Sequence, residues 1–278
     1  MKKNVLITID EAIKIIQREE AIILDSTINK INKNLDQKNL ELIPNSQFLN
    51  IEENFSLKNA QFPHSMIDAA KFTSETRKLG INENSTVLLY DRWGIYSSPR
   101  AWWMFRYMGF ENVFVLNGGL PAWKVAGMPI SNQYISKKDQ LGNYTAKEQN
   151  SWLTSKENLL NNLNNEKYSI IDARSKERFL GLAPEPRLGL RSGHISGSTN
   201  LPFNEVLNGI YYHGREQLER IFNINNMEKE NPHVFTCGSG ITAAIIALAG
   251  YEIGLNQISI YDGSWAEWGS DPNLPISK

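Results

Sequence analysis

Residues 168–173 read YSIIDA and residues 21–26 read AIILDS, so an apolar run ends at an aspartate twice, 147 positions apart. Two aromatic motifs repeat at almost the same interval: LNGGLPAW ends at Trp123, and YDGSWAEW ends at Trp268, 145 positions later. Unrelated markers would not keep one interval to within two residues by chance. The chain therefore consists of two copies of one domain.

The two copies set the expected architecture. A polar stretch at 131–150 separates them, so we expect one domain at 1–138 and a second at 139–278. Within each copy, short β-branched runs such as Thr86–Tyr90 alternate with helical stretches such as Ala101–Tyr107. This alternation predicts α/β domains, each with a mostly parallel sheet flanked by helices. Ligands of such sheets bind at the carboxyl ends of the strands.

Composition excludes several classes of protein. Lys and Arg number 29 and Asp and Glu number 30, so the chain lacks the basic surface of a nucleic-acid binder. The most apolar stretch, Ile241–Gly250, is far shorter than the ~20 residues of a membrane span. A single cysteine, Cys237, excludes an intrachain disulfide, and the scattered histidines have no zinc-ligand spacing. Because the N-terminus also lacks the apolar core of a secretory signal, we expect a cytoplasmic protein.

Cys237 follows a strand-like run and precedes an apolar helical run, in the loop CGSGIT. Glycines on both sides of Ser239 let the backbone turn tightly and direct its N–H groups inward. The helix that follows adds its positive N-terminal end, and these dipoles together stabilise a thiolate, the nucleophilic form of cysteine. We therefore expect Cys237 to be a catalytic nucleophile. The residues expected to surround its sulfur and bind the substrate are Gly238, Gly240, Ile241 and Thr242.

Three other interpretations of this loop are weaker. A lone cysteine is often a small buried hydrophobic residue, but such a residue needs no flanking glycines at a strand end. The pattern Gly238-x-Gly240-x-x-Ala243 matches a dinucleotide-binding fingerprint, yet no acidic strand-end residue follows about 20 positions later. Cysteine-dependent phosphatases clamp phosphate with an arginine six positions after the cysteine, where this chain has Ala243.

The loop CGSGITA resembles the active-site loop of the sulfurtransferases related to rhodanese, and in particular that of the 3-mercaptopyruvate sulfurtransferases. Further similar stretches, which together cover most of the chain, are DRWGIYSSPRAWWMFRYMGF, VLNGGLPAW, DARSKERFLGLAPEPRLGLRSGHISGSTNLPF and YDGSWAEWGSDPNLPI. The resemblance implies two tandem rhodanese-like domains, of which the first is catalytically silent and the second carries the cysteine. Asp91, 146 positions before Cys237, fits that silence because it stands where the nucleophile would be.

An irregular segment, FLGLAPEP, distinguishes the second copy, and its prolines exclude a regular helix. Arg178 and Arg187 flank this segment, and a guanidinium group binds a carboxylate through two parallel hydrogen bonds. The resemblance assigns the two arginines to the carboxylate and the ketone of 3-mercaptopyruvate. The alternative is that they are solvated or form surface ion pairs, for example with Glu177 or Glu185.

The resemblance implies an enzyme without a metal or organic cofactor. The Cys237 thiolate attacks the sulfur of 3-mercaptopyruvate and pyruvate leaves as its enolate. The resulting persulfide passes its sulfur to cyanide or to a thiol such as thioredoxin or glutathione. Thiosulfate is the alternative donor, but loops that bind this dianion usually carry basic residues, whereas the loop here is uncharged. A second alternative is a non-catalytic rhodanese-like module that carries sulfur or docks partners, which would not need both arginines and the cysteine.

Protonation of the leaving enolate completes the expected site. In the resembled family, a serine two residues after the cysteine works with a histidine and an acidic residue of the first domain. The similar residues here are Ser239 and, in FLNIEENFSLKNAQFPHSM, His64 as general acid–base and Glu52 as the orienting carboxylate. The segment has one more residue between acid and histidine than the family pattern, so Glu53 is the alternative. A surface histidine without a catalytic role is the other interpretation of His64.

Overall fold

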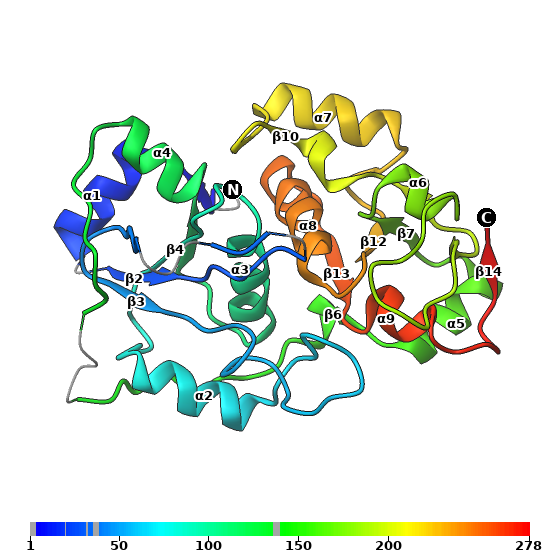
Figure 1. Cartoon of the computed structure of the whole chain (residues 1–278), viewed down its shortest axis with the longest axis horizontal. Helices are drawn as coiled ribbons and strands as arrows, with labels where there is room; N and C mark the ends of the chain where they lie inside the picture. The colour runs from blue at the N-terminus through cyan, green and yellow to red at the C-terminus, as the bar shows by residue number, and fades with distance from the viewer. Residues whose placement is uncertain (1–3, 20, 32, 36–38, 136–139) are drawn as a thin grey trace. The chain divides into compact units, whose positions relative to one another are not determined.

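Two units make up the structure, a computed structural model that describes residues 4–19, 21–31, 33–35, 39–135 and 140–278 (Figure 1). The first unit comprises Met1–Lys58, Met66–Gln149 and Gly209–Tyr212. The second comprises Asn59–Ser65, Asn150–Asn208 and His213–Lys278. Each unit therefore includes a short segment from the other half of the sequence. His64, expected from the first domain, belongs to the second unit.

The expected boundary between residues 138 and 139 lies outside the described residues, and the chain changes unit at Asn150. The residues just before Asn150 pack on the first unit through backbone hydrogen bonds. The amide of Gly142 donates to the carbonyl of Arg77 over 2.8 Å, and that of Lys147 donates to the carbonyl of Met108 over 2.9 Å. A polar composition favours a linker, but it is equally compatible with a segment whose backbone groups are paired with its own domain.

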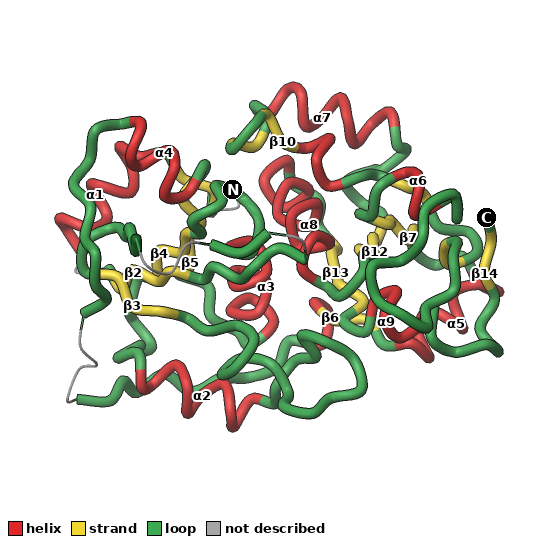
Figure 2. Tube along the Cα trace, in the orientation of Figure 1, coloured by secondary structure: helices red, strands yellow, loops and turns green. Residues whose placement is uncertain are grey.

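The first unit is built on a five-stranded parallel sheet with the strand order β1-β5-β4-β2-β3. Figure 2 draws the strands in yellow and labels β2, β3, β4 and β5 of this sheet. Its strands are β1 (Leu6–Ile7), β2 (Ile22–Asp25), β3 (Ser46–Phe48), β4 (Val87–Tyr90) and β5 (Val113–Leu116). Its helices are α1 (Ile9–Glu19), α2 (Ala69–Lys78), α3 (Ser98–Tyr107) and α4 (Gly119–Val125). Strands β2, β4 and β5 are buried at every position, as expected of strands covered by helices on both faces.

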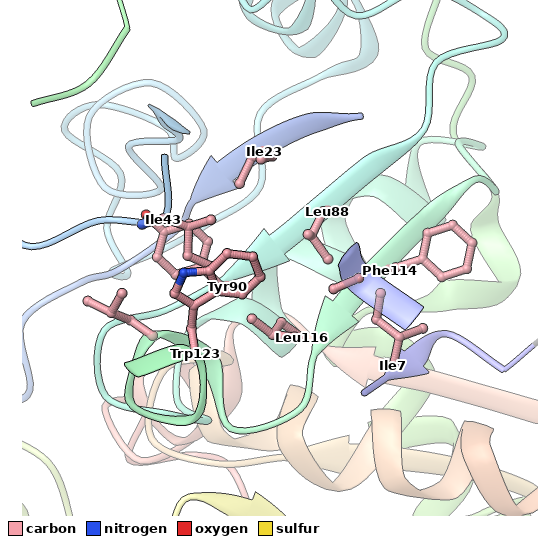
Figure 3. Close-up of a cluster of buried hydrophobic side chains, with 10 residues drawn as sticks. Ile7, Ile23, Ile43, Leu88, Tyr90, Phe114, Leu116 and Trp123 are labelled. Carbon is pink, nitrogen blue, oxygen red and sulfur yellow. Dashed lines mark hydrogen bonds between the residues drawn. The ribbon is translucent and has the colours of Figure 1, made fainter. Parts of the chain in front are cut away.

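Helices α1 and α4 cover one face of this sheet. Figure 3 shows the buried side chains there, where Ile23 and Leu88 of the strands belong to the same cluster as Trp123 of α4. Helix α1 begins with a capping box, in which the Glu11 carboxylate accepts from the amide and hydroxyl of Thr8 and the Thr8 hydroxyl accepts from the amide of Glu11. Helix α3 packs on β4 and β5 from the other face.

A second five-stranded parallel sheet, with the order β6-β13-β12-β7-β9, forms the centre of the second unit. Its strands are β6 (Leu153–Thr154), β7 (Ser169–Asp172), β9 (Thr199–Asn200), β12 (Pro232–Thr236) and β13 (Gln257–Tyr261). Its helices are α5 (Lys156–Asn165), α6 (Lys176–Phe179), α7 (Arg215–Ile224), α8 (Ile241–Ile253) and α9 (Ser264–Trp268). The other short elements of the described chain are the 3-10 helices Asn150–Trp152 and Phe203–Val206 and the strands β8 (His194–Ile195), β10 (Leu207–Asn208), β11 (Tyr211–Tyr212) and β14 (Ile276–Ser277).

Helix α8 is apolar on almost all sides because it lies between the sheet and α7, in contact with β12, β13 and α7. Helices α5 and α9 supply a separate core on this sheet. There Leu159 of α5 and Trp265 and Trp268 of α9 cluster with Ile170 and Val234 of the central strands. The apolar, glycine-flanked helix after the cysteine is therefore a buried core helix, and its N-terminus is fixed in place by that packing.

Both five-stranded sheets have the order 1-5-4-2-3 when the strands of each sheet are numbered along the chain, so the repeat in sequence is also a repeat in topology. The expected α/β fold with mostly parallel sheets is confirmed. Asp25 and Asp172 end equivalent strands, and the strand beside each of them leads directly to Asp91 or to Cys237. These four residues therefore lie at the carboxyl ends of the strands, where ligands of parallel sheets bind.

Candidate active site

Cys237 lies in a tight loop at the carboxyl end of β12, immediately before α8. Its side chain is buried, with 2% of the residue's surface exposed. The amide of Gly240 donates a hydrogen bond to the sulfur over 3.1 Å, and Gly240 has a φ of +81°, which favours glycine. The sulfur therefore lies beside an amide proton and the N-terminus of a helix. Ile241 and Thr242 form the first turn of α8, where Ile241 is buried and Thr242 is half-buried.

The start of α9 holds the carbonyl groups of this loop. The amide of Trp265 donates to the carbonyl of Cys237 over 2.9 Å, and the amide of Ala266 donates to the carbonyl of Gly238 over 3.0 Å. Ser264 has a φ of +50°, which few non-glycine residues adopt, and its hydroxyl accepts from the amide of Cys237 over 3.4 Å. The sequence indicates no such role for this segment, because backbone hydrogen bonds leave no pattern of side chains.

Both predicted substrate arginines lie against the cysteine loop. Arg178 is in α6, and Arg187 directly follows the irregular segment FLGLAPEP. A β-carbon built on Gly238 would lie 3.1 Å from Nη2 of Arg178 and 3.8 Å from Nη1 of Arg187. The lack of a side chain at Gly238 thus lets two guanidinium groups approach the residue next to the nucleophile. The structure brings together the residues that the sequence predicts as a carboxylate clamp.

The two arginines differ in their existing partners. Glu185 accepts hydrogen bonds from Nε of Arg178 over 3.2 Å and from Nη2 over 2.5 Å. The guanidinium group of Arg187 has no hydrogen-bond or ion-pair partner among the described residues, so its donors and its charge are available to an anion. The ion pair with Glu185 was the alternative to substrate binding in the sequence. In the structure Arg178 forms this ion pair and lies beside Gly238 at the same time.

His64 lies beside Ser239 in the second unit. Its Nδ1 atom is 3.2 Å from the hydroxyl oxygen of Ser239 and 3.3 Å from its carbonyl oxygen. His64 is partly buried and has a φ of +63°, a conformation that non-glycine residues keep where the surrounding structure requires it. The two side chains are close enough to exchange a proton. Glu52 and Glu53 are exposed residues of the first unit, and the orienting role of either one stays a prediction.

The equivalent loop of the first unit is filled by its own carboxylate. Asp91 is fully buried, and its Oδ2 atom accepts hydrogen bonds from the amides of Tyr96, Ser97 and Ser98 over 2.8 to 3.1 Å. The Ser98 hydroxyl donates to the same oxygen over 2.8 Å, and the amide of Trp93 donates to Oδ1 over 3.0 Å. This loop has no thiol, and the amides that point into it already donate to Asp91. It therefore lacks the nucleophile of the second unit, and these amides are not free to bind a substrate.

A separate pocket lies at the other end of the second sheet. It has a volume of about 580 Å³, and residues at the starts of β7 and β12, among them Ser169 and Pro232, line it. It contains none of the residues around Cys237. Among the described residues, no three His, Cys, Asp or Glu side chains are grouped to hold a metal ion. None of the described helices is both long enough and apolar enough to cross a bilayer.

Known proteins resemble this chain in sequence along both copies. The family model described as the rhodanese-like domain matches residues 8–126 and 155–271. The 3-mercaptopyruvate sulfurtransferase of Mus musculus is 35% identical over 229 residues, which cover 81% of this chain and 76% of the relative. The thiosulfate sulfurtransferase of Cricetulus griseus is 36% identical over 232 residues, which again cover 81% and 76%.

The fold agrees with a solved structure. The crystal structure of SseA from Escherichia coli, described as a 3-mercaptopyruvate sulfotransferase, matches with a TM-score of 0.83 at 28% identity and covers 95% of this chain and 99% of that one. Relatives named for either sulfur donor match at nearly the same identity, so the choice of donor has to be argued from the site. The matches along both copies, the shared topology and the cysteine loop lead to one conclusion: the chain belongs to the family of sulfurtransferases built from two rhodanese-like domains.

Proposed function

We propose that the protein transfers the sulfur of 3-mercaptopyruvate to an acceptor through a persulfide on Cys237 and releases pyruvate. The observation that carries this proposal is the position of two guanidinium groups, those of Arg178 and Arg187, 3.1 and 3.8 Å from a β-carbon built on Gly238. They provide a carboxylate-binding pair next to a nucleophilic sulfur. A substrate that carries a carboxylate, a ketone and a thiol within three carbons can engage both at once.

In the first half-reaction, the Cys237 thiolate attacks the thiol sulfur of the substrate. A bond forms between the two sulfur atoms while the bond from that sulfur to C3 of the substrate breaks, and the electron pair stays on the organic fragment as the enolate of pyruvate. Arg187 binds the carboxylate with its free donors. Arg178 donates to the keto oxygen, where negative charge develops as the enolate forms, so this hydrogen bond strengthens in the transition state.

The enolate then takes up one proton and becomes pyruvate. Ser239 is two residues from the nucleophile, and its hydroxyl oxygen lies 3.2 Å from Nδ1 of His64. We assign the proton to a relay in which the Ser239 hydroxyl protonates C3 and regains a proton from the imidazolium group of His64. Imidazole suits this role because it both gives and takes protons near neutral pH.

In the second half-reaction, the acceptor removes the outer sulfur. A thiolate attacks that sulfur, the bond between the two sulfur atoms of the persulfide breaks, and its electron pair returns to Cys237 as a thiolate. The acceptor leaves as its own persulfide, and cyanide in the same position leaves as thiocyanate. Thioredoxin and glutathione are the proposed thiols, since both present a nucleophilic sulfur to a disulfide-like bond.

The charge of the site favours 3-mercaptopyruvate over thiosulfate. The loop residues 238–240 carry no charge, and the charge of Arg178 is balanced by Glu185, 2.5 Å away. Arg187 then contributes the uncompensated positive charge of this cluster. One positive charge matches the single carboxylate of 3-mercaptopyruvate better than it matches the two negative charges of thiosulfate.

A side-by-side measurement of kcat/KM for the two donors, with the same acceptor, tests the proposal. We expect 3-mercaptopyruvate to be used at least about tenfold more efficiently, a difference of ~1.4 kcal/mol in transition-state binding. The Cys237→Ser variant is the control and should be inactive with both donors. Equal use of the two donors, or a preference for thiosulfate, would favour the second candidate function, which the 36% identity to a thiosulfate sulfurtransferase supports.

A further inference from the structure

Four charged side chains of the second unit form a row that leads from the sheet to Arg178. The carboxylate of Asp172, at the end of β7, binds Arg174 over 2.6 Å, and Arg174 binds Glu185 over 2.8 Å. Glu185 in turn binds Arg178 over 2.5 Å. The first three side chains are at most 2% exposed, and that of Arg178 is 22% exposed. The row of alternating charges therefore begins in the interior and ends at the cysteine loop.

Glu185 is itself held in place. Its Oε1 atom accepts hydrogen bonds from Nη1 of Arg174 and from Nε of Arg178, and its Oε2 atom accepts from Nη2 of Arg178. The side chain of Arg174 is fixed by two further contacts. Its Nη2 atom donates to the carbonyl of Gly193 over 2.8 Å, and its Cζ atom lies 4.2 Å from the ring centroid of Trp265. A long side chain such as Arg178 loses much rotamer freedom when it is fixed, and the anchored carboxylate fixes it before substrate binds.

Stability alone does not account for this row of charges. Removing charged groups from water costs about as much free energy as their pairing returns, so buried ion pairs are weak evidence for stability. The first unit offers an internal comparison: at the equivalent strand end, Asp25 pairs with Arg92 over 3.1 Å and accepts from the Tyr134 hydroxyl over 2.8 Å. Its sheet has the same strand order. Among the described residues of that unit, Arg92 forms no further ion pair, whereas Arg174 is followed by Glu185 and then by Arg178 beside the cysteine loop.

We propose that Glu185 is a positioning residue, which holds the guanidinium group of Arg178 against Gly238 and balances its charge. Because Arg178 is balanced, Arg187 presents the charge that binds the substrate carboxylate, and Arg178 is left to serve the keto oxygen. Glu185 acts through Arg178 and not on the substrate. The inference rests on the proposed function, since it names the group that orients the arginine assigned to the ketone.

The variant Glu185→Gln keeps the shape of the side chain but leaves one carbonyl oxygen to serve two arginines. Its matched control is Glu177→Gln, which removes the carboxylate next to Arg178 in the sequence. That carboxylate is exposed and has no hydrogen-bond or ion-pair partner among the described residues. Rates are divided by the number of Cys237 thiols titrated in the folded enzyme, so that a loss of folded protein does not lower them.

We expect Glu185→Gln to lower kcat/KM for 3-mercaptopyruvate about tenfold, chiefly through kcat, because Arg178 loses a charge-assisted partner and serves the keto oxygen in the transition state. Glu177→Gln should stay within about twofold of the wild type, as is usual for exposed charges. A purely structural role for Glu185 would change the fraction of active enzyme and leave kcat per titrated active site where it is. A wild-type kcat per active site in Glu185→Gln would therefore overturn the inference.

A double-mutant cycle with Arg178→Ala supplies the second test. If Glu185 acts through Arg178, then Glu185→Gln has no further effect on kcat/KM once residue 178 is alanine. The same loss in both backgrounds would refute the positioning role. A wild-type enzyme that uses thiosulfate and not 3-mercaptopyruvate would refute the proposed function instead. The cycle measured with thiosulfate would then still decide whether Glu185 acts through Arg178.

Discussion

The Nδ1 atom of His64 lies 3.2 Å from the hydroxyl oxygen of Ser239, although 175 positions separate the two residues in the sequence. The contact lies within the second unit, because the segment Asn59–Ser65 packs there. It brings a titratable ring to the residue two positions after the nucleophile, and His64 adopts a φ of +63° in this arrangement. A disfavoured backbone conformation at such a position supports a chemical role for the ring.

Replacing His64 with alanine should slow the protonation of the enolate. We expect kcat for 3-mercaptopyruvate to fall about 10²-fold in His64→Ala, a typical loss for a general acid–base, while iodoacetamide alkylates Cys237 at close to the wild-type rate. His213→Ala is a control, since His213 is a half-buried histidine of the same unit. An unchanged kcat and pH profile in His64→Ala would mean that water protonates the enolate.

Cys237 should carry an additional sulfur atom after reaction with 3-mercaptopyruvate in the absence of an acceptor. Mass spectrometry of the intact protein and of its peptides measures this directly, and the added mass should disappear when a thiol is supplied. Because Cys237 is the sole cysteine of the chain, Cys237→Ser should show neither the added sulfur nor turnover. Turnover by that variant would contradict a persulfide mechanism.

The two arginines should fail in different ways when they are replaced. Each of Arg178→Ala and Arg187→Ala should reduce kcat/KM for 3-mercaptopyruvate. The loss of transition-state stabilisation should be about 2–5 kcal/mol, because each variant removes one partner of a desolvated charged hydrogen bond. The loss in Arg187→Ala should appear chiefly in KM, since a carboxylate is bound equally before and during the reaction. The loss in Arg178→Ala should appear chiefly in kcat, since charge reaches the keto oxygen only in the transition state.

Transfer of sulfur from a preloaded persulfide to a thiol provides the internal control for both variants, because that step involves neither the carboxylate nor the ketone. Arg220→Ala, which removes an exposed guanidinium group of α7, is the matched substitution elsewhere in the second unit. Wild-type kcat and KM in both clamp variants would show that the arginines do not bind the substrate.

Asp91 should stabilise the first unit, because its carboxylate accepts hydrogen bonds from four amides and one hydroxyl in a buried loop. Asp91→Ala leaves these donors without an acceptor and should lower the free energy of unfolding by at least about 2 kcal/mol. Asp91→Asn retains one oxygen and should lose less. Urea denaturation measures both values, with Glu111→Ala, an exposed acidic residue of the same unit, expected within about 0.5 kcal/mol of the wild type.

The central strands and their ends could be predicted from the sequence. The runs that end at Asp25 and Asp172 are strands, and Asp91 and Cys237 follow neighbouring strands at the same edge of each sheet. Strands of this kind are easy to find because burial on both faces requires a continuous apolar run. The two five-stranded sheets have the same strand order, as the repeat in the sequence implies.

The pairing of charges could not be predicted in the same way. From the sequence, an ion pair between Glu185 and an arginine is an alternative to substrate binding by that arginine. In the structure, Glu185 forms this ion pair with Arg178 while Arg178 lies beside Gly238. Which carboxylate meets which guanidinium group depends on the path of an irregular segment, and such a path has no period. The amides of Trp265 and Ala266 that anchor the cysteine loop are equally hidden, because every non-proline residue carries the same backbone donor.

The exchange of short segments between the two units limits how the protein can be divided. A cut between residues 138 and 139 leaves Cys237 and both clamp arginines on the C-terminal fragment and His64 on the N-terminal one. On the proposed mechanism, that C-terminal fragment would retain the nucleophile and lack the group that reprotonates Ser239. On that mechanism the halves are not interchangeable modules, since the segment Asn59–Ser65 of the copy without a thiol packs in the unit that carries Cys237.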